Sequence, residues 1–220
     1  MEQGLLNLYK YQNNNNPIII EYRNKRKILS EVMNDIYLKE LENNYEFHYY
    51  SLVSFIEKTI TKYYKTLNIK NYALDTNSGQ QFIILTLIYN YAGNGIPACH
   101  YYLNKCRYKK IEKIQMLNNI CNSKIGLFEI VSFDKQTKRI IAHNIITNEI
   151  IEIIDEGLSY ACEYQNVKDY ILLSRVLKID DYYVNDGTIQ LKNADKLINL
   201  YKNNKINDVE LLILGKAFDM

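Results

Sequence analysis

The chain has 220 residues, of which 47% are hydrophobic, and a formal net charge of +2. A chain of this length can bury a substantial core, and its two prolines and eight glycines leave no Pro- or Gly-rich linker. So small a net charge does not in itself indicate a nucleic-acid or membrane partner. The 21 tyrosines are expected mostly at the boundary of the core, with the ring buried and the hydroxyl in water.

The charge is divided unevenly, because residues 1–123 carry a balance of +5 and residues 124–220 a balance of −3. The N-terminal segment lacks the basic, apolar and small-residue regions of a signal peptide, and the longest apolar run, 82–89, is too short to cross a bilayer. Without an export signal, we expect reduced thiols at Cys99, Cys106, Cys121 and Cys162. These features predict a cytoplasmic protein with no membrane partner.

Apolar residues recur at helical spacing through the first half of the chain. The pattern predicts helices over 27–43, 45–67, 78–93 and 108–121, with a short segment at 99–103 before the last of these. The Ser-x-x-Gln arrangement at 78–81 is able to cap the first turn of its helix, and Gly93 is suited to end it. Residues 18–20 form either a short strand or the start of the first helix.

From residue 126 the period changes to that of strands. We predict strands at 126–133, 139–145, 149–154, 170–179, 182–184 and 188–191. Turn residues separate them, and Asn185-Asp186-Gly187 predicts a hairpin turn. Residues 156–169 show no clear pattern. Helical spacing returns at 193–203 and in a last helix capped by Asn207 or Asp208.

This order predicts an α+β protein with three parts. A helical domain occupies 1–123, and a small antiparallel β sheet or barrel, SH3-like or OB-like, occupies 124–192. Two C-terminal helices at 193–220 are expected to pack on the body, because they are strongly apolar.

The β part resembles a module of uncharacterised proteins of low-GC bacteria. The resemblance rests on Gly126-Leu-Phe-Glu-Ile-Val-Ser-Phe-Asp134, on the run from Ile145 to Ser159, and on Ser174-Arg-Val. It spans residues 126–191 and implies a small β module of unknown role. It implies no catalytic residues and no metal.

One cluster has the residue types of a metal site. Cys99-His100 and Cys106 supply three ligands, and a fourth would have to come from Cys121 or His143. The spacing is not that of a structural zinc site, so small buried thiols explain it better and we predict neither a metal nor a cofactor.

No convergent catalytic set is visible. Asp134 is expected to be a turn residue and Asp155 a cap at the end of a strand, which leaves neither for acid–base work. His143 could act as a base toward Ser132 or Ser174 only if the fold brought them together, and no nucleophile-elbow motif accompanies them. We therefore predict no catalytic residue.

A basic segment with aromatic neighbours is the strongest candidate for nucleic-acid binding. Its cations and its ring could contact phosphates and bases. The candidate residues are Lys105, Arg107, Tyr108, Lys109, Lys110 and Lys113. Ordinary solvated helix ends explain the same residues without any ligand, since the segment makes no long block of like charge.

These observations favour a non-enzymatic binding or regulatory protein that contacts another macromolecule, with a protein as the expected partner. One alternative is a nucleic-acid-binding protein that uses a basic helix at 105–113. A second alternative is an enzyme with a pocket between the helical and β parts, where clefts commonly bind ligands. The apolar C-terminal helix also predicts self-association.

Overall fold

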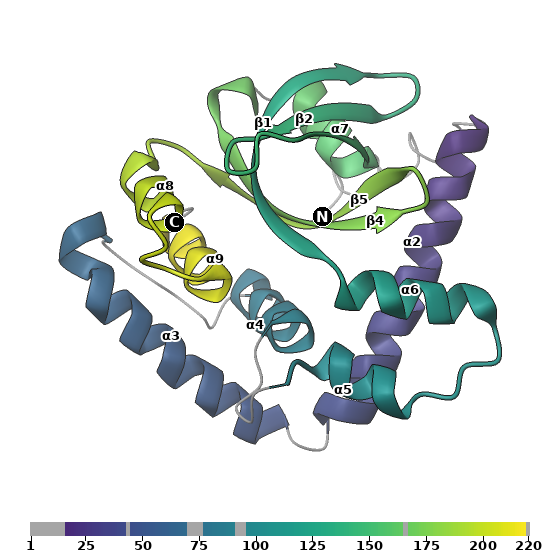
Figure 1. Cartoon of the computed structure of the whole chain (residues 1–220), viewed down its shortest axis with the longest axis horizontal. Helices are drawn as coiled ribbons and strands as arrows, with labels where there is room; N and C mark the ends of the chain where they lie inside the picture. Colours follow the sequence, from purple (N-terminus) through teal and green to yellow (C-terminus); the bar gives the residue numbers. More distant parts are fainter. Residues whose placement is uncertain (1–15, 43–44, 70–76, 91–95, 165–166, 219–220) are drawn as a thin grey trace.

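The computed structural model describes residues 16–42, 45–69, 77–90, 96–164 and 167–218. Helices come first, a five-stranded sheet follows, and two helices end the chain, which confirms the predicted α+β class (Figure 1). The helical part contains α2 (Pro17–Ile36), its π-helical continuation η1 (Tyr37–Leu41), α3 (Tyr45–Leu67), α4 (Asn77–Tyr89), α5 (Ala98–Lys105) and α6 (Ile111–Cys121).

The first helix begins ten residues earlier than the periodicity predicts. Asn16 caps it, since its side-chain Oδ1 accepts a 3.0 Å hydrogen bond from the Ile18 amide, and Pro17 occupies the first helical position. Residues 18–20 are therefore helical. The bounds of α3 agree with the prediction, and the predicted stop at Gly93 lies outside the described residues.

Five strands form the sheet. They are β1 (Lys124–Asp134), β2 (Arg139–Asn144), β3 (Ile150–Ile154), β4 (Ile171–Ile179) and β5 (Tyr182–Leu191). Their order is β1-β2-β3-β5-β4, and β4 pairs again with β1, so that the sheet closes into a barrel. All pairings are antiparallel except that of β3 with β5, which is parallel at Ile153 and Tyr183. The sheet is thus mixed, where the sequence predicts an antiparallel one.

The segment without a clear pattern contains α7 (Glu156–Tyr164) and a 3-10 turn, η3 (Val167–Asp169). Leu158, Cys162 and Val167 from this segment pack into the barrel interior, against side chains such as Phe128 and Ile140. A helix between the third and fourth strands, together with this strand order, matches the OB-like alternative rather than the SH3-like one.

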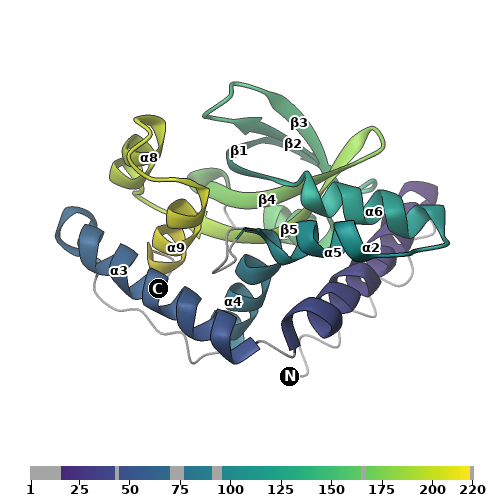
Figure 2. The ribbon, with the colours of Figure 1, turned by 60° about the horizontal axis from the view of Figure 1, so that its bottom comes forward.

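The helices pack in two groups. One consists of α2, α5 and α6, and the other of α3 with α8 (Asp195–Lys202) and α9 (Asp208–Phe218), while α4 lies between them (Figures 1 and 2). The last helix begins with a capping box: the Glu210 amide donates to Asn207 Oδ1 at 2.9 Å, and the Asn207 amide donates to Glu210 Oε2 at 3.0 Å. This confirms the predicted cap at Asn207.

One hydrophobic cluster runs without a break from the first helical group into the barrel wall. Buried side chains of α2, α4 and α6 pack there against the ends of β3, β4 and β5. Its fully buried members include Val32, Leu87, Leu117, Ile120, Leu177 and Val184. Surface ion pairs add to this contact, among them Arg23 with Glu156 at 2.7 Å and Lys25 with Asp180 at 3.0 Å.

Candidate functional site

A pocket of about 180 Å³ lies where α4, β4, β5 and α9 meet. Apolar side chains make most of its wall, and a few charged and polar groups reach it from the strands and from α9. The apolar lining consists of Phe82, Leu85, Leu173, Ile189 and Leu212, and the polar lining includes Gln81, Asn90, Arg175, Asp186 and Lys216. The pocket lies between the helical and β parts, which is the place that the enzyme alternative from the sequence predicts for one.

A β-bulge shapes the polar side of this pocket. Ser174 pairs with Thr188 and Val176 with Asn185, so that Asp186 and Gly187 together lie opposite Arg175. Bulges of this kind redirect side chains and are common beside functional sites. Gly187 has φ +100, a conformation that other residues rarely adopt.

This bulge corrects the predicted hairpin turn at Asn185-Asp186-Gly187. The chain reverses earlier, at Asp180, which has φ +51, and β5 then continues from Tyr182 to Leu191 without interruption. The same residue types serve both structures, because a turn and a glycine bulge each need a residue that tolerates positive φ.

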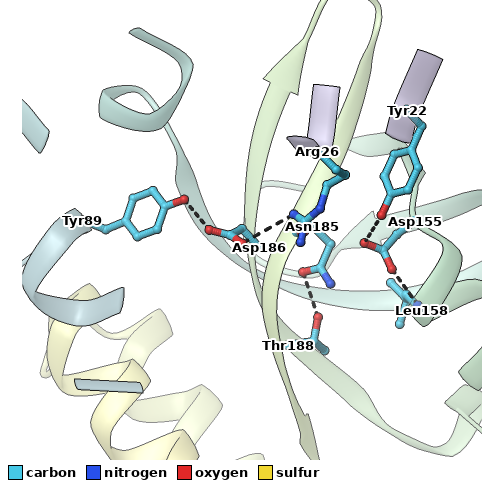
Figure 3. A network of polar contacts seen from close by, with 8 residues as sticks. All are labelled: Tyr22, Arg26, Tyr89, Asp155, Leu158, Asn185, Asp186 and Thr188. Atoms are coloured by element: carbon cyan, nitrogen blue, oxygen red, sulfur yellow. Dashed lines mark hydrogen bonds and ion pairs between the residues drawn. The ribbon is translucent and has the colours of Figure 1, made fainter. Parts of the chain in front are cut away.

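The Asp186 carboxylate is held by two partners. Tyr89 donates a short hydrogen bond to its Oδ2, and Arg26 Nη1 lies 3.5 Å from its Oδ1 (Figure 3). Arg26 also donates to the Asn185 carbonyl at 2.8 Å. Burial and the nearby Asp186 charge raise the pKa of Tyr89, so this phenol stays a donor at neutral pH. The Asp186 carboxylate therefore already has a cation, Arg26, and a hydrogen-bond donor, Tyr89, within the protein.

Arg175 is the most unusual group at the pocket. It is 6% exposed, and its guanidinium donates to neutral partners, Ser123 Oγ at 2.8 Å and Asn90 Oδ1. Its Cζ lies 4.3 Å from the centre of the Tyr89 ring. No carboxylate among the described residues lies within ion-pair distance of it, and burial lowers the pKa of Arg175, although the Asp186 charge is near enough to act in the opposite direction. Buried arginines are usually paired with an anion, so this one is suited to receive an anion from outside.

A second buried carboxylate lies at the junction of α2 with the barrel. Asp155 is 6% exposed, accepts a 3.1 Å hydrogen bond from the Tyr22 hydroxyl and caps α7 by accepting from the Leu158 amide at 2.7 Å (Figure 3). Its predicted role as a cap at the end of a strand is confirmed. Asp134 is likewise a turn residue, since it accepts from the Gln136 amide at 2.8 Å.

The basic segment is not a helix, which corrects the prediction of one at 105–113. Lys105 ends α5, residues 106–110 form a non-helical connection, and α6 begins at Ile111. The connection is drawn toward α2, because Tyr108 donates to Asp35 at 2.6 Å and Lys113 lies 3.0 Å from Glu31.

Half of the six candidate residues for nucleic-acid binding are engaged with acidic partners inside the protein. Lys105 lies 3.5 Å from Glu40, in addition to the contacts of Tyr108 and Lys113. Within the part of the chain that the structure describes, Arg107, Lys109 and Lys110 have no acidic partner, although Arg107 donates to the Cys106 carbonyl.

The fold brings Cys99, His100 and Cys121 together, with ligand atoms that all lie within 4.8 Å of one another. Cys106 is not part of this group, and His143 is engaged elsewhere: its Nε2 lies 2.9 Å from Asn148 Oδ1 and its Nδ1 3.7 Å from Glu129. Ser174 Oγ bonds Thr188 Oγ1 at 2.6 Å, so no contact joins it to His143.

Sequence reasoning named Asp186 only as part of a turn and Arg175 only as part of the resemblance, and it did not place either in a pocket. Arg175 offers one signal, since it is the only charge within the apolar run 171–177 of a predicted strand. Tyr89, Arg26 and Asp186 offer none, because each is an ordinary residue for its local element and only the tertiary structure joins them.

No described helix combines the length and the apolar character that crossing a bilayer requires. Neither the curated proteins nor the solved structures contain a match to this chain. A family model does match, over residues 16–210, which include the barrel, the cysteine cluster and the pocket lining except Leu212 and Lys216. The chain therefore belongs to DUF7986, a family of unknown function.

Proposed function

We propose that this protein is a cytoplasmic binding or regulatory protein whose ligand is a small molecule with an apolar body and an anionic group. The pocket between α4, β4, β5 and α9 is its site. One observation carries the proposal: a buried guanidinium, Arg175, with only neutral hydrogen-bond partners, lines a pocket with apolar walls. Such pockets, with few polar groups that fix orientation, are typical of small-molecule sites.

The charge of the ligand follows from the groups already paired. Asp186 is paired with the Arg26 cation and accepts a hydrogen bond from Tyr89, whereas Arg175 has donors left, since a guanidinium has five N–H groups and two of its nitrogens make the hydrogen bonds described. Lys216 adds a second cation at the wall of the pocket. A carboxylate or phosphate would thus find two cations beside apolar surface.

The size of the ligand follows from the volume. An engineered apolar cavity of about 150 Å³ takes up benzene, so a pocket of similar volume accepts one ring or a short branched chain. We expect a monocyclic or short aliphatic acid, or the acidic end of a larger molecule.

The test compares benzoate with benzamide, which have nearly the same shape and differ in charge. Benzoate at a hundredfold excess over its Kd should raise Tm by roughly 5 to 10 °C, and benzamide should not. Calorimetric titration then gives the two affinities. Equal affinity for the two compounds would reject the proposal. It would also be rejected if the protein bound no member of a panel of small acids that includes benzoate and phenyl phosphate.

Variants place the binding in the pocket. Arg175→Gln removes the buried charge and should abolish benzoate binding, with a circular dichroism spectrum like that of the wild type. Lys216→Gln removes the second cation at the pocket wall and should weaken binding about tenfold, the effect of a single charge contact of about 1.4 kcal/mol. Lys196→Gln on α8 removes an exposed cation that is not part of the lining and serves as the matched control. An unchanged affinity in both pocket variants would show that the ligand binds elsewhere.

A second candidate function, contact with a protein partner, rests on the outer face of β1 to β3. Val131 and Ile150 are 52% and 69% exposed there, large fractions for apolar side chains. Glu129, Arg139 and Glu152 surround them, so this face lacks the excess of cations that nucleic acid needs. Chemical crosslinking of wild type and of a Val131→Ser/Ile150→Ser double variant tests it: a partner, or a second copy, should crosslink only to the wild type.

A further inference from the structure

The cysteine and histidine cluster joins two helices of the first helical group. Cys99 and His100 lie in the first turn of α5, and Cys121 is the last residue of α6, which packs beside α5 (Figure 1). Cys99 is only 1% exposed. Two thiols and an imidazole, from two helices, thus lie within 4.8 Å of one another.

The spacing of these donors is close to that around a zinc ion. With Zn–S bonds of about 2.3 Å and Zn–N bonds of about 2.0 Å, ligand atoms in a tetrahedral site lie roughly 3.5 to 3.8 Å apart. The three ligand atoms all lie within 4.8 Å of one another. Each pair therefore needs to approach by no more than about 1.3 Å, which side-chain rotation can supply.

We propose that Cys99, His100 and Cys121 bind one zinc ion, and that Cys106 supplies the fourth ligand. Cys106 follows α5 directly and is half-buried. Its Sγ makes only a weak contact of 3.8 Å with the Leu103 carbonyl, which leaves it able to turn toward the metal. The set Cys₃His is a common structural zinc site.

A metal here would fix α5 against the end of α6. Ser123, two residues beyond Cys121, accepts the hydrogen bond from Arg175. The zinc site would therefore have a structural role, next to the pocket but independent of its ligand.

The experiment measures metal content of the full chain, purified without a metal-affinity tag under reducing conditions. Plasma mass spectrometry should find about one zinc per chain. Replacement by Co²⁺ should give the thiolate charge-transfer band in the near ultraviolet and the intense visible bands of a tetrahedral ion. Release by a chelator should lower Tm, because the metal binds only the folded chain.

Variants assign the ligands. Cys121→Ser and His100→Asn should lose the stoichiometric zinc, and Cys106→Ser should weaken binding at least tenfold. Cys162→Ala removes a thiol from the barrel interior and should keep the metal. Metal retained by Cys106→Ser at wild-type affinity would exclude Cys106. A wild type without metal would overturn the proposal.

Discussion

The Tyr22 hydroxyl on α2 donates a 3.1 Å hydrogen bond to the Asp155 carboxylate, 133 residues later at the end of β3. Both residues are buried, with 6% of each exposed. The same carboxylate caps α7 through the Leu158 amide at 2.7 Å. A single acidic group thus connects the first helix, the barrel and α7, whose Leu158 and Cys162 pack against the strands.

Tyr22→Phe should lower the free energy of unfolding by about 1 to 3 kcal/mol, because it leaves a buried carboxylate without one of its donors. Denaturant unfolding followed by circular dichroism measures the change. Tyr201→Phe is the matched control, since Tyr201 donates to Asp208 at 2.8 Å at the surface, and it should cost less than about 0.5 kcal/mol. Equal losses in the two variants would contradict the role assigned to Tyr22.

Asp155 should make stability depend on pH in an unusual direction. Burial raises the pKa of Asp155 above its value in the unfolded chain, despite the opposing effects of the Leu158 amide, Arg26 and Tyr22. Between the unfolded pKa of about 4 and the higher folded pKa, the folded state holds a proton that the unfolded state has released. The contribution of Asp155 to stability is therefore largest at the acidic end and is lost as pH rises through the folded pKa.

Asp155→Asn isolates this contribution. The unfolding free energy of the wild type minus that of the variant should fall as pH rises from about 4 and then become constant. Denaturant titrations at a series of pH values provide the difference. A difference that grows with pH would show that hydrogen bonding, and not burial, dominates at this carboxylate.

Gly187→Ala should cost about 1 kcal/mol or more, since φ +100 strains any residue with a Cβ. Space is not the obstacle, because the nearest atom to the added Cβ is Leu85 Cδ1 at 3.9 Å. Gly157→Ala in α7 is the control and should be neutral or stabilising by about 0.5 to 1 kcal/mol, as its Cβ meets only Asp155 Oδ1 at 3.4 Å. Thermal unfolding measures the change in stability of each variant. A loss in Gly187→Ala without a loss in Gly157→Ala would confirm that the bulge conformation requires glycine.

Reversal of the charges at Arg107, Lys109 and Lys110 should leave binding to nucleic acid unchanged. Three exposed cations without a longer block of like charge give a weak field, and the wild type is expected to leave a heparin column below about 0.15 M salt. The triple Glu variant should elute at the same salt. Strong retention of the wild type, lost in the variant, would restore the nucleic-acid alternative.

Local rules predicted most elements of the fold. The change from helical to strand spacing near residue 125 marks the start of the barrel, and Asn207 and Asp134 perform the capping and turn roles typical of their residue types. Such features depend on neighbours within four positions, which the sequence displays directly.

The pocket depends on relations that the sequence does not display. Asn185-Asp186-Gly187 fits a turn as well as a bulge, and only the pairing of β4 with β5 decides between them. Arg175 meets Asn90, 85 residues away, and Ser123, 52 residues away. Contacts of this range follow from the packing of whole elements, so no pattern along the chain predicted them.

The hydrophobic cluster that continues from α2, α4 and α6 into the barrel wall determines how cooperatively the protein unfolds. Leu177 and Val184 are covered by helices, so a barrel released from those helices would present them to water. Heating should therefore melt strands and helices in one cooperative step. An isolated fragment of 124–192 would depend on added partners or detergents to stay dispersed.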